Sequence, residues 1–310
     1  MKVRRFGAGA LVVLALGAFL VACGDDDDTT AASGGDTTET TASGGDAKTN
    51  EIPSVTFGAT DDVAAKKFTF DVPSDIKGGA VTVEVDNKGK EVHDLQFVKA
   101  SAGHTLDDLL KVVDSEESPT PEWLATASGV GSTAPGTKNA ASVVLEPGKY
   151  FYFCTESSGD DPNSISHAAN GMAGEVTVGA DSGAELPETD ASITASEYKF
   201  DVSGVKAGEN TFTFSNAGKQ LHHVIAAPIA EGKTLDDVKT AFASEGEPSG
   251  PPPVDFENFV ATAVVGPGQS EVATWNLKPG KYAMFCFMTD YNTPGPPHVA
   301  KGMLQELDVK

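Results

Sequence analysis

Two segments of this chain carry a cysteine, a histidine and a methionine in the same order, each preceded by a further histidine. The later set comprises His222, Cys286, His298 and Met303, and the earlier set comprises His93, Cys154, His167 and Met172. One thiolate and two imidazoles in a plane, with a weak axial thioether, suit copper in both of its oxidation states, so that an electron can move with little rearrangement. The residue types therefore indicate a candidate redox-metal site in each segment.

The two sets belong to an internal repeat. NKGKEVHDL, which starts at Asn87, reads like NAGKQLHHV from Asn216, and TLDD occurs at Thr105 and again at Thr234. Further along, PGKYFYFC is matched by PGKYAMFC and HAANGM by HVAKGM, and the histidine, cysteine and methionine landmarks keep an offset of 129 to 132 residues. Such self-similarity predicts two copies of one domain. We place them at residues 51–179 and 191–310, with residues 180–190 as a linker.

Each copy has the pattern of an all-β domain. KFTFDV, AVTVEV, YKFDV and NTFTF alternate apolar with polar residues, and an Asn-x-Gly turn signal follows the second strand of each copy. One short helical insertion per copy is expected at TLDD, where threonine caps the N-terminus and aspartates occupy the first turn. The pattern predicts two tandem Greek-key β-sandwiches or small barrels, each with a helical insertion.

The order and spacing of the four donors resemble the cupredoxin, or blue copper, family. In that family the first histidine follows a strand and a turn, and the other three ligands lie in one loop between the last two strands; NAGKQLHHVI is similar to the plastocyanin stretch around the first copper histidine. The resemblance covers both copies and implies at most one type 1-like copper in each. It implies equatorial ligands and an axial methionine in each copy: His222, Cys286 and His298 with Met303, and His93, Cys154 and His167 with Met172.

The gap from cysteine to histidine departs from the plastocyanin and azurin pattern. It is C-x11-H in the second copy and C-x12-H in the first, longer than in those proteins, whereas copper nitrite reductases combine a longer gap with the same H-x4-M. Gly171 and Gly302, just before each methionine, are expected to let backbone pass close to the site.

Other interpretations of these residues remain open. Cys154 and Cys286 follow aromatic residues on apolar strands, which also suits buried free thiols, or one disulfide between the copies in an exported protein. His223 is expected to point to the opposite face of its strand from His222, or else to lie at the surface near a copper edge. His104 falls outside the repeat and is expected at the surface.

The remaining histidines argue against catalysis. Two-domain copper oxidases and nitrite reductases need His-x-His pairs or a histidine beside the cysteine, and this chain of six histidines has neither. We therefore expect an electron carrier and not an enzyme. The alternatives are a copper-free scaffold or adhesion module, and a copper storage or delivery protein that uses the same ligands.

The N-terminus has the features of an export signal. Residues 1–22 combine a basic start with an apolar stretch, and Leu20-Val21-Ala22-Cys23 resembles the bacterial lipobox, which implies lipid attachment at Cys23. Residues 23–50 contain almost nothing apolar and are expected to form a disordered acidic linker. We expect a membrane lipoprotein on the extracytoplasmic face, with an ordinary signal peptide as the alternative.

The charge of the chain restricts its partners. A formal net charge of −23 argues against nucleic acid and anionic lipid surfaces, and leaves open a redox protein partner.

Overall fold

The computed structural model describes residues 51–113, 119–158, 166–243 and 250–310. The predicted signal peptide, the lipidation site Cys23 and the acidic linker lie outside these ranges. Within them, none of the helices has the length and apolar character needed to cross a membrane.

The described residues of the first half form eight strands and two short helices. The elements are β1 (Ser54–Asp62), β2 (Lys67–Asp71), β3 (Ile76–Asn87), β4 (His93–Lys99), α1 (Leu106–Val113), η1 (Glu122–Leu124), β5 (Ser128–Thr133), β6 (Lys138–Leu145), β7 (Gly148–Phe153) and β8 (Ala173–Asp181). Strand β1 pairs in parallel with β3 and antiparallel with β2, while β3 pairs antiparallel with β6. A second layer has the order β8-β7-β4-β5 and joins the first through the start of β3.

The second half repeats this order of strands, but among its described residues the two layers are separate sheets. Its elements are β9 (Ala191–Ser196), β10 (Lys199–Ser203), β11 (Gly208–Asn216), β12 (Ile225–Pro228), α2 (Leu235–Ala243), β13 (Val260–Ala261), β14 (Ser270–Leu277), β15 (Gly280–Phe285), η2 (His298–Lys301) and β16 (Leu304–Val309). Strands β10, β9, β11 and β14 form one layer, with β9 parallel to β11, and the other layer has the order β13-β12-β15-β16. The all-β fold with two cupredoxin-like Greek-key sandwiches is therefore confirmed.

Each sandwich encloses its own apolar core. In the first half Phe57, Val83 and Val85 are fully buried between the layers, and Ile193, Phe212 and Phe214 are their counterparts in the second. Inward-facing residues alternate with outward-facing ones along these strands, which is why the period-2 pattern of the sequence predicts them.

The helical insertions begin where the sequence predicts. Thr105 Oγ1 accepts a hydrogen bond from Asp108 N at 3.3 Å, and Asp108 Oδ2 accepts one from Thr105 N at 3.0 Å; Thr234 and Asp237 make the same reciprocal pair before α2. Each threonine and aspartate thus satisfies two backbone donors that the helix cannot pair internally.

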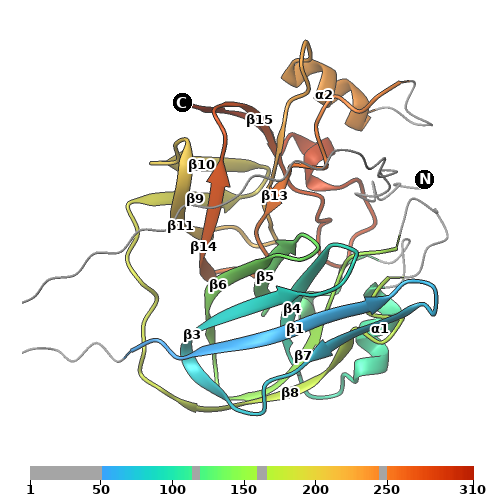
Figure 1. Ribbon diagram of the computed structural model, residues 1–310, viewed down its shortest axis with the longest axis vertical. Coiled ribbons are helices and arrows are strands. Elements are labelled where there is room, and N and C mark those ends of the chain that lie inside the picture. The colour runs from blue at the N-terminus through green and yellow to red at the C-terminus, as the bar shows by residue number, and fades with distance from the viewer. Residues whose placement is uncertain (1–50, 114–118, 159–165, 244–249) are drawn as a thin grey trace, which may run out of the picture.

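The two halves form one continuous sheet across their junction. Strand β14 pairs antiparallel with β6, with Glu271, Val272 and Ala273 opposite Val143, Ser142 and Ala141. Figure 1 shows β14 of the upper half meeting β6 of the lower half at the centre of the molecule. A further apolar cluster packs Leu124 and Phe153 of the first half with Leu221 and Tyr291 of the second. The halves are therefore joined by backbone hydrogen bonds and by shared core.

Candidate metal centres

The strand frame brings the predicted donors of each copy together. In the first half His93 opens β4 and Cys154 directly follows β7, and these strands are paired with Gln96 opposite Phe153. In the second half β12 pairs with β15, with Ile225 opposite Phe285, so that His222 and Cys286 approach in the same way. His167 and His298 return from the loop that follows each cysteine.

The geometry of the two groups is nearly the same. Cys154 Sγ lies 3.9 Å from His93 Nδ1 and 3.6 Å from His167 Nδ1. In the second group Cys286 Sγ lies 3.9 Å from His222 Nδ1 and 3.6 Å from His298 Nδ1. The donor atoms of each group lie within 4.8 Å of one another, and all six side chains are 0 % exposed. We call these groups centre 1 and centre 2.

The two methionines lie beside the centres. Met172 and Met303 are 0 % exposed and belong to the same apolar clusters as Cys154 and Cys286. Each methionine N–H donates to the carbonyl of the preceding loop histidine at 2.9 Å. Just before them Gly171 and Gly302 have φ values of 106° and 103°, in the left-handed region where glycine is favoured. The expected close approach of backbone is found at Gly171, where a Cβ would lie 3.1 Å from the Phe68 carbonyl oxygen, but not at Gly302.

A buried asparagine shapes the turn before the first histidine of each centre. Asn87 Nδ2 donates to the carbonyls of Glu91 and Thr133, both at 2.8 Å, and Asn87 Oδ1 accepts the Gly89 N–H at 2.9 Å. Asn216 makes the same three bonds with the corresponding residues of the second half. The Asn-x-Gly signal therefore marks a turn that holds the His93 and His222 loops.

Burial sets the protonation states of the donors. It lowers the pKa of His93 and His298, and lowers that of His167 and of His222 to about 4, so the imidazoles are neutral near pH 7. Burial also raises the pKa of Cys286 to about 12 and that of Cys154 well above its usual value. Metal binding must therefore displace a thiol proton at each centre, while the imidazoles already have a free lone pair.

Carboxylates fix the orientation of three of the four imidazoles. Asp61 Oδ2 lies 3.2 Å from His93 Nε2, Glu91 Oε2 lies 2.8 Å from His167 Nε2, and Asp290 Oδ1 lies 3.1 Å from His298 Nε2. A carboxylate beside Nε2 keeps the proton on that nitrogen. Nδ1, which faces the cysteine, then keeps the lone pair that can bind a metal. These contacts select the tautomer that a metal at each centre requires.

The residue after the first histidine of each copy has a structural role that the sequence analysis missed. Asp94 Oδ1 accepts the Thr155 N–H at 2.6 Å, and His223 Nε2 accepts the Phe287 N–H at 2.9 Å. His223, expected on the opposite face of its strand from His222 or else at the surface, is partly buried, and burial lowers its pKa to about 3. The sequence feature that could have indicated this role is the position of Asp94 and His223, each directly after the first histidine of its centre.

The structure also bears on the disulfide alternative and on His104. Cys154 and Cys286 are both free thiols, which removes the disulfide alternative. His104 is partly exposed and stacks on Trp123, with ring centroids 4.4 Å apart. Within the described ranges, the two centres are the only groups of three such side chains that could hold a metal ion.

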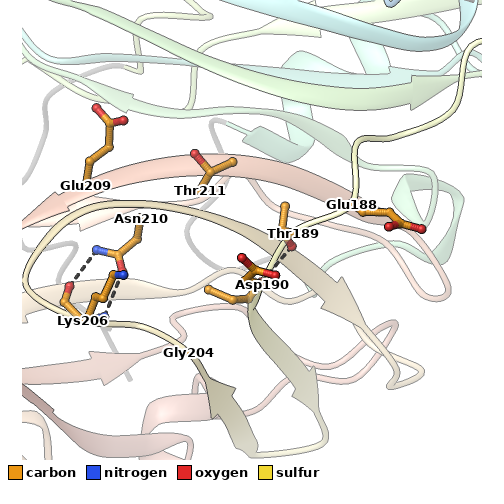
Figure 2. Close-up of a pocket in the computed structure, with 9 residues that line it drawn as sticks. Glu188, Thr189, Asp190, Gly204, Lys206, Glu209, Asn210 and Thr211 are labelled. Atoms are coloured by element: carbon orange, nitrogen blue, oxygen red, sulfur yellow. Dashed lines mark hydrogen bonds between the residues drawn. The ribbon is translucent and has the colours of Figure 1, made fainter. Parts of the chain in front are cut away.

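A polar pocket of about 280 Å³ lies elsewhere, at the start of the second half. It is lined by Glu188, Asp190, Glu209 and their neighbours, and Asn210 holds the Lys206 backbone across it through both its N–H and its carbonyl (Figure 2). None of the donors of either centre lines this pocket.

The donor set fits copper. One thiol sulfur and two Nδ1 atoms per centre, with a buried methionine alongside, are the His₂Cys set with an axial thioether that defines type 1-like copper sites. The centres lie where the last two strands and the first histidine of each sandwich meet. The fold and the donor sets together define tandem cupredoxin-like domains with type 1-like copper sites.

No family model and no curated protein sequence matches the chain. Among solved structures, it is similar to reduced auracyanin from Roseiflexus castenholzii at 26% identity, over 38% of this chain and 94% of that one, with a TM-score of 0.25. It is also similar to a multicopper oxidase at 16% identity (84% and 89% covered, TM-score 0.25) and to the copper nitrite reductase of Nitrosomonas europaea at 17% (84% and 94%, TM-score 0.24).

Proposed function

We propose that this chain is an exported, lipid-anchored copper protein that transfers single electrons through two type 1-like centres. The observation that carries the proposal is the duplicated, fully buried His₂Cys group, with Cys Sγ to His Nδ1 distances of 3.6 and 3.9 Å in both halves. Copper bound by these donors would supply a one-electron couple.

The residues around each centre suit electron transfer. The donors are fixed by paired strands, by the Asn87 and Asn216 turns and by hydrogen bonds that hold the segment after each cysteine. A frame of this kind resists rearrangement when the charge at the centre changes, which keeps the cost of electron transfer low. Burial of every donor excludes water from the centre.

The same burial argues against a catalytic role. A catalytic metal site keeps an open position for substrate, whereas the donors here are 0 % exposed. The described residues also offer no third group of histidines, cysteines or acids that could hold a further metal. These observations support the proposal of a carrier.

The cellular setting rests on the sequence. The Leu-Val-Ala-Cys motif that ends at Cys23 and the acidic segment after it favour a lipid anchor and a tether that places the two domains on the extracytoplasmic face of a membrane. Mass spectrometry of the mature protein tests this part, because a lipid-modified N-terminal Cys23 is expected, and an unmodified N-terminus at another residue contradicts it.

The function is tested by adding Cu(II) to the mature protein and recording visible absorption and bound metal. An intense thiolate–copper band and two coppers per chain are expected, and the Cys154→Ser/Cys286→Ser double variant should lose both. Bound copper without that band would favour storage or delivery. An absence of binding, unchanged in the double variant, would leave a copper-free scaffold.

A further inference from the structure

The outer surroundings of the two centres differ in charge at five repeat positions. At one of them Ser158 corresponds to Asp290 and the second half is the more negative, whereas the other four act in the opposite direction. Glu91 of the first half corresponds to Gln220, Asp94 to His223, Glu156 to Met288 and Asn170 to Lys301. At each of these four positions the first half is the more negative one. Because the donors themselves are the same, these residues change the electrostatics and not the ligand set.

Four carboxylates lie around centre 1. Asp61 and Glu91 hydrogen-bond the Nε2 atoms of its two histidines, at 3.2 and 2.8 Å. Asp94 and Glu156 lie on the cysteine side, where their backbone N–H groups bond the Cys154 sulfur and their negative charges help to raise the pKa of its thiol. No lysine or arginine pairs with Asp61 or Glu91 among the described residues.

Centre 2 has a more balanced environment. Asp290 bonds His298 Nε2 at 3.1 Å, but Lys301 forms an ion pair with the same carboxylate and Tyr198 donates its hydroxyl to it. Glu197 lies near His222 without reaching its Nε2, which has no hydrogen-bond partner among the described residues. The cysteine side carries the neutral His223 and Met288 in place of two acids.

Negative charge beside a copper centre stabilises Cu(II) relative to Cu(I). One unit of charge at about 7 Å in an effective dielectric of about 20 changes such an equilibrium by roughly tenfold or more. A carboxylate on the outer nitrogen of a ligating histidine acts in the same direction, since it makes the imidazole a stronger donor.

We infer that centre 1 has the lower reduction potential, so that a single electron given to the protein resides at centre 2. This inference rests on the proposed function. In the exchange, Cu(I) at centre 1 is oxidised to Cu(II) while Cu(II) at centre 2 is reduced to Cu(I), and no other reactant is needed. We expect the equilibrium to favour centre 2 by about tenfold or more, equivalent to about 59 mV or more for one electron.

A chain of hydrogen bonds connects the two centres. Gln96, which is 2 % exposed, donates to Asp94 Oδ2 at 3.1 Å and accepts the Val264 N–H at 3.1 Å. Val265, the next residue, donates its N–H at 2.7 Å to the carbonyl of His222, a candidate metal ligand of centre 2. The polar contact between the halves thus runs from beside one centre to the backbone of the other, which suits exchange within one molecule.

The inference is tested by spectroelectrochemical titration of the copper-loaded protein. Two midpoint potentials are expected; Cys154→Ser should retain the higher one and Cys286→Ser the lower one. Equal potentials, or the lower potential in the Cys154→Ser protein, would overturn the inference. Absence of a thiolate–copper band in both proteins would instead refute the proposed function.

Two substitutions, each of which gives one copy the residue of the other, test whether these charges cause the difference in potential. Glu91→Gln should raise the potential of centre 1, since the amide oxygen still accepts from His167 while the charge is lost, and Lys301→Asn should lower that of centre 2. The matched control is Lys281→Gln, which removes an exposed ion pair with Glu306 at the far end of β15 from Cys286 and should move neither potential. If neither Glu91→Gln nor Lys301→Asn changes a reduction potential, the electrostatic explanation is refuted.

Discussion

The two halves of this protein share the inner parts of a metal site and differ in what lies around it. Both centres have the same sulfur-to-nitrogen distances, the same asparagine turn and the same left-handed glycine before the methionine. The differences lie one residue further out, at Glu91 and Gln220 or Asn170 and Lys301. The strand frame therefore determines where the donors lie, while residues outside the frame are free to set the electrostatics of each centre.

The largest expected effect comes from removing one sulfur at a time. Cys154→Ser and Cys286→Ser should each lower the copper content from two per chain to one, because each thiolate belongs to a separate buried group. Metal analysis and visible absorption measure this. Loss of both coppers in one single variant would show that the centres are not independent.

The asparagine turns should be equally important in the two halves. Asn87→Ala and Asn216→Ala each remove three hydrogen bonds, one of them buried, so each should lower the free energy of unfolding by about 2–4 kcal/mol. Denaturant unfolding of the metal-free protein gives these values. Thr211→Val, which removes only an exposed hydrogen bond to Thr274, serves as the control and should change little.

A smaller effect is expected where the halves differ at their junction. Glu271 on β14 is 0 % exposed, and one of its carboxylate oxygens has no hydrogen-bond partner among the described residues. Burial raises its pKa to about 8. The corresponding residue on β6 is Asn139. Because the unfolded carboxyl titrates near 4.5, the stability of the folded state falls as the pH rises from about 4.5 to 8.

The Glu271→Gln variant removes this pH dependence. The amide oxygen can still accept the Ala263 N–H, so the variant should be more stable than the parent by about 1–2 kcal/mol at pH 8 and nearly equal to it at pH 4.5. Thermal unfolding at the two pH values measures the difference. A gain of equal size at both would show that ionisation of Glu271 is not the cause.

Much of the inner architecture could be predicted from the sequence. Period-2 strands, the Asn-x-Gly turns and the threonine caps are local signals, and the repeat makes each of them visible twice. The repeat also singles out His93, Cys154, His167 and Met172 with their counterparts, because independent coincidences at one offset are rare.

The outer contacts could not be predicted in the same way. Asp61 is 32 residues from His93, and Glu91 is 76 residues from His167, so these pairs arise only when separate strands and loops meet. The pairing of β6 with β14 and the Gln96 contact with Val264 depend on how the halves pack, which no local pattern encodes. The hydrogen bond from Phe287 N–H to His223 Nε2 likewise exists only in the folded loop.

The most direct test of the central claim is to locate copper in crystals of the metal-loaded protein by its anomalous scattering. We predict two copper positions, each bonded to one cysteine Sγ and to the Nδ1 atoms of two histidines, at Cys154 and at Cys286. Copper bound only at surface carboxylates, with both cysteine groups empty, would contradict it.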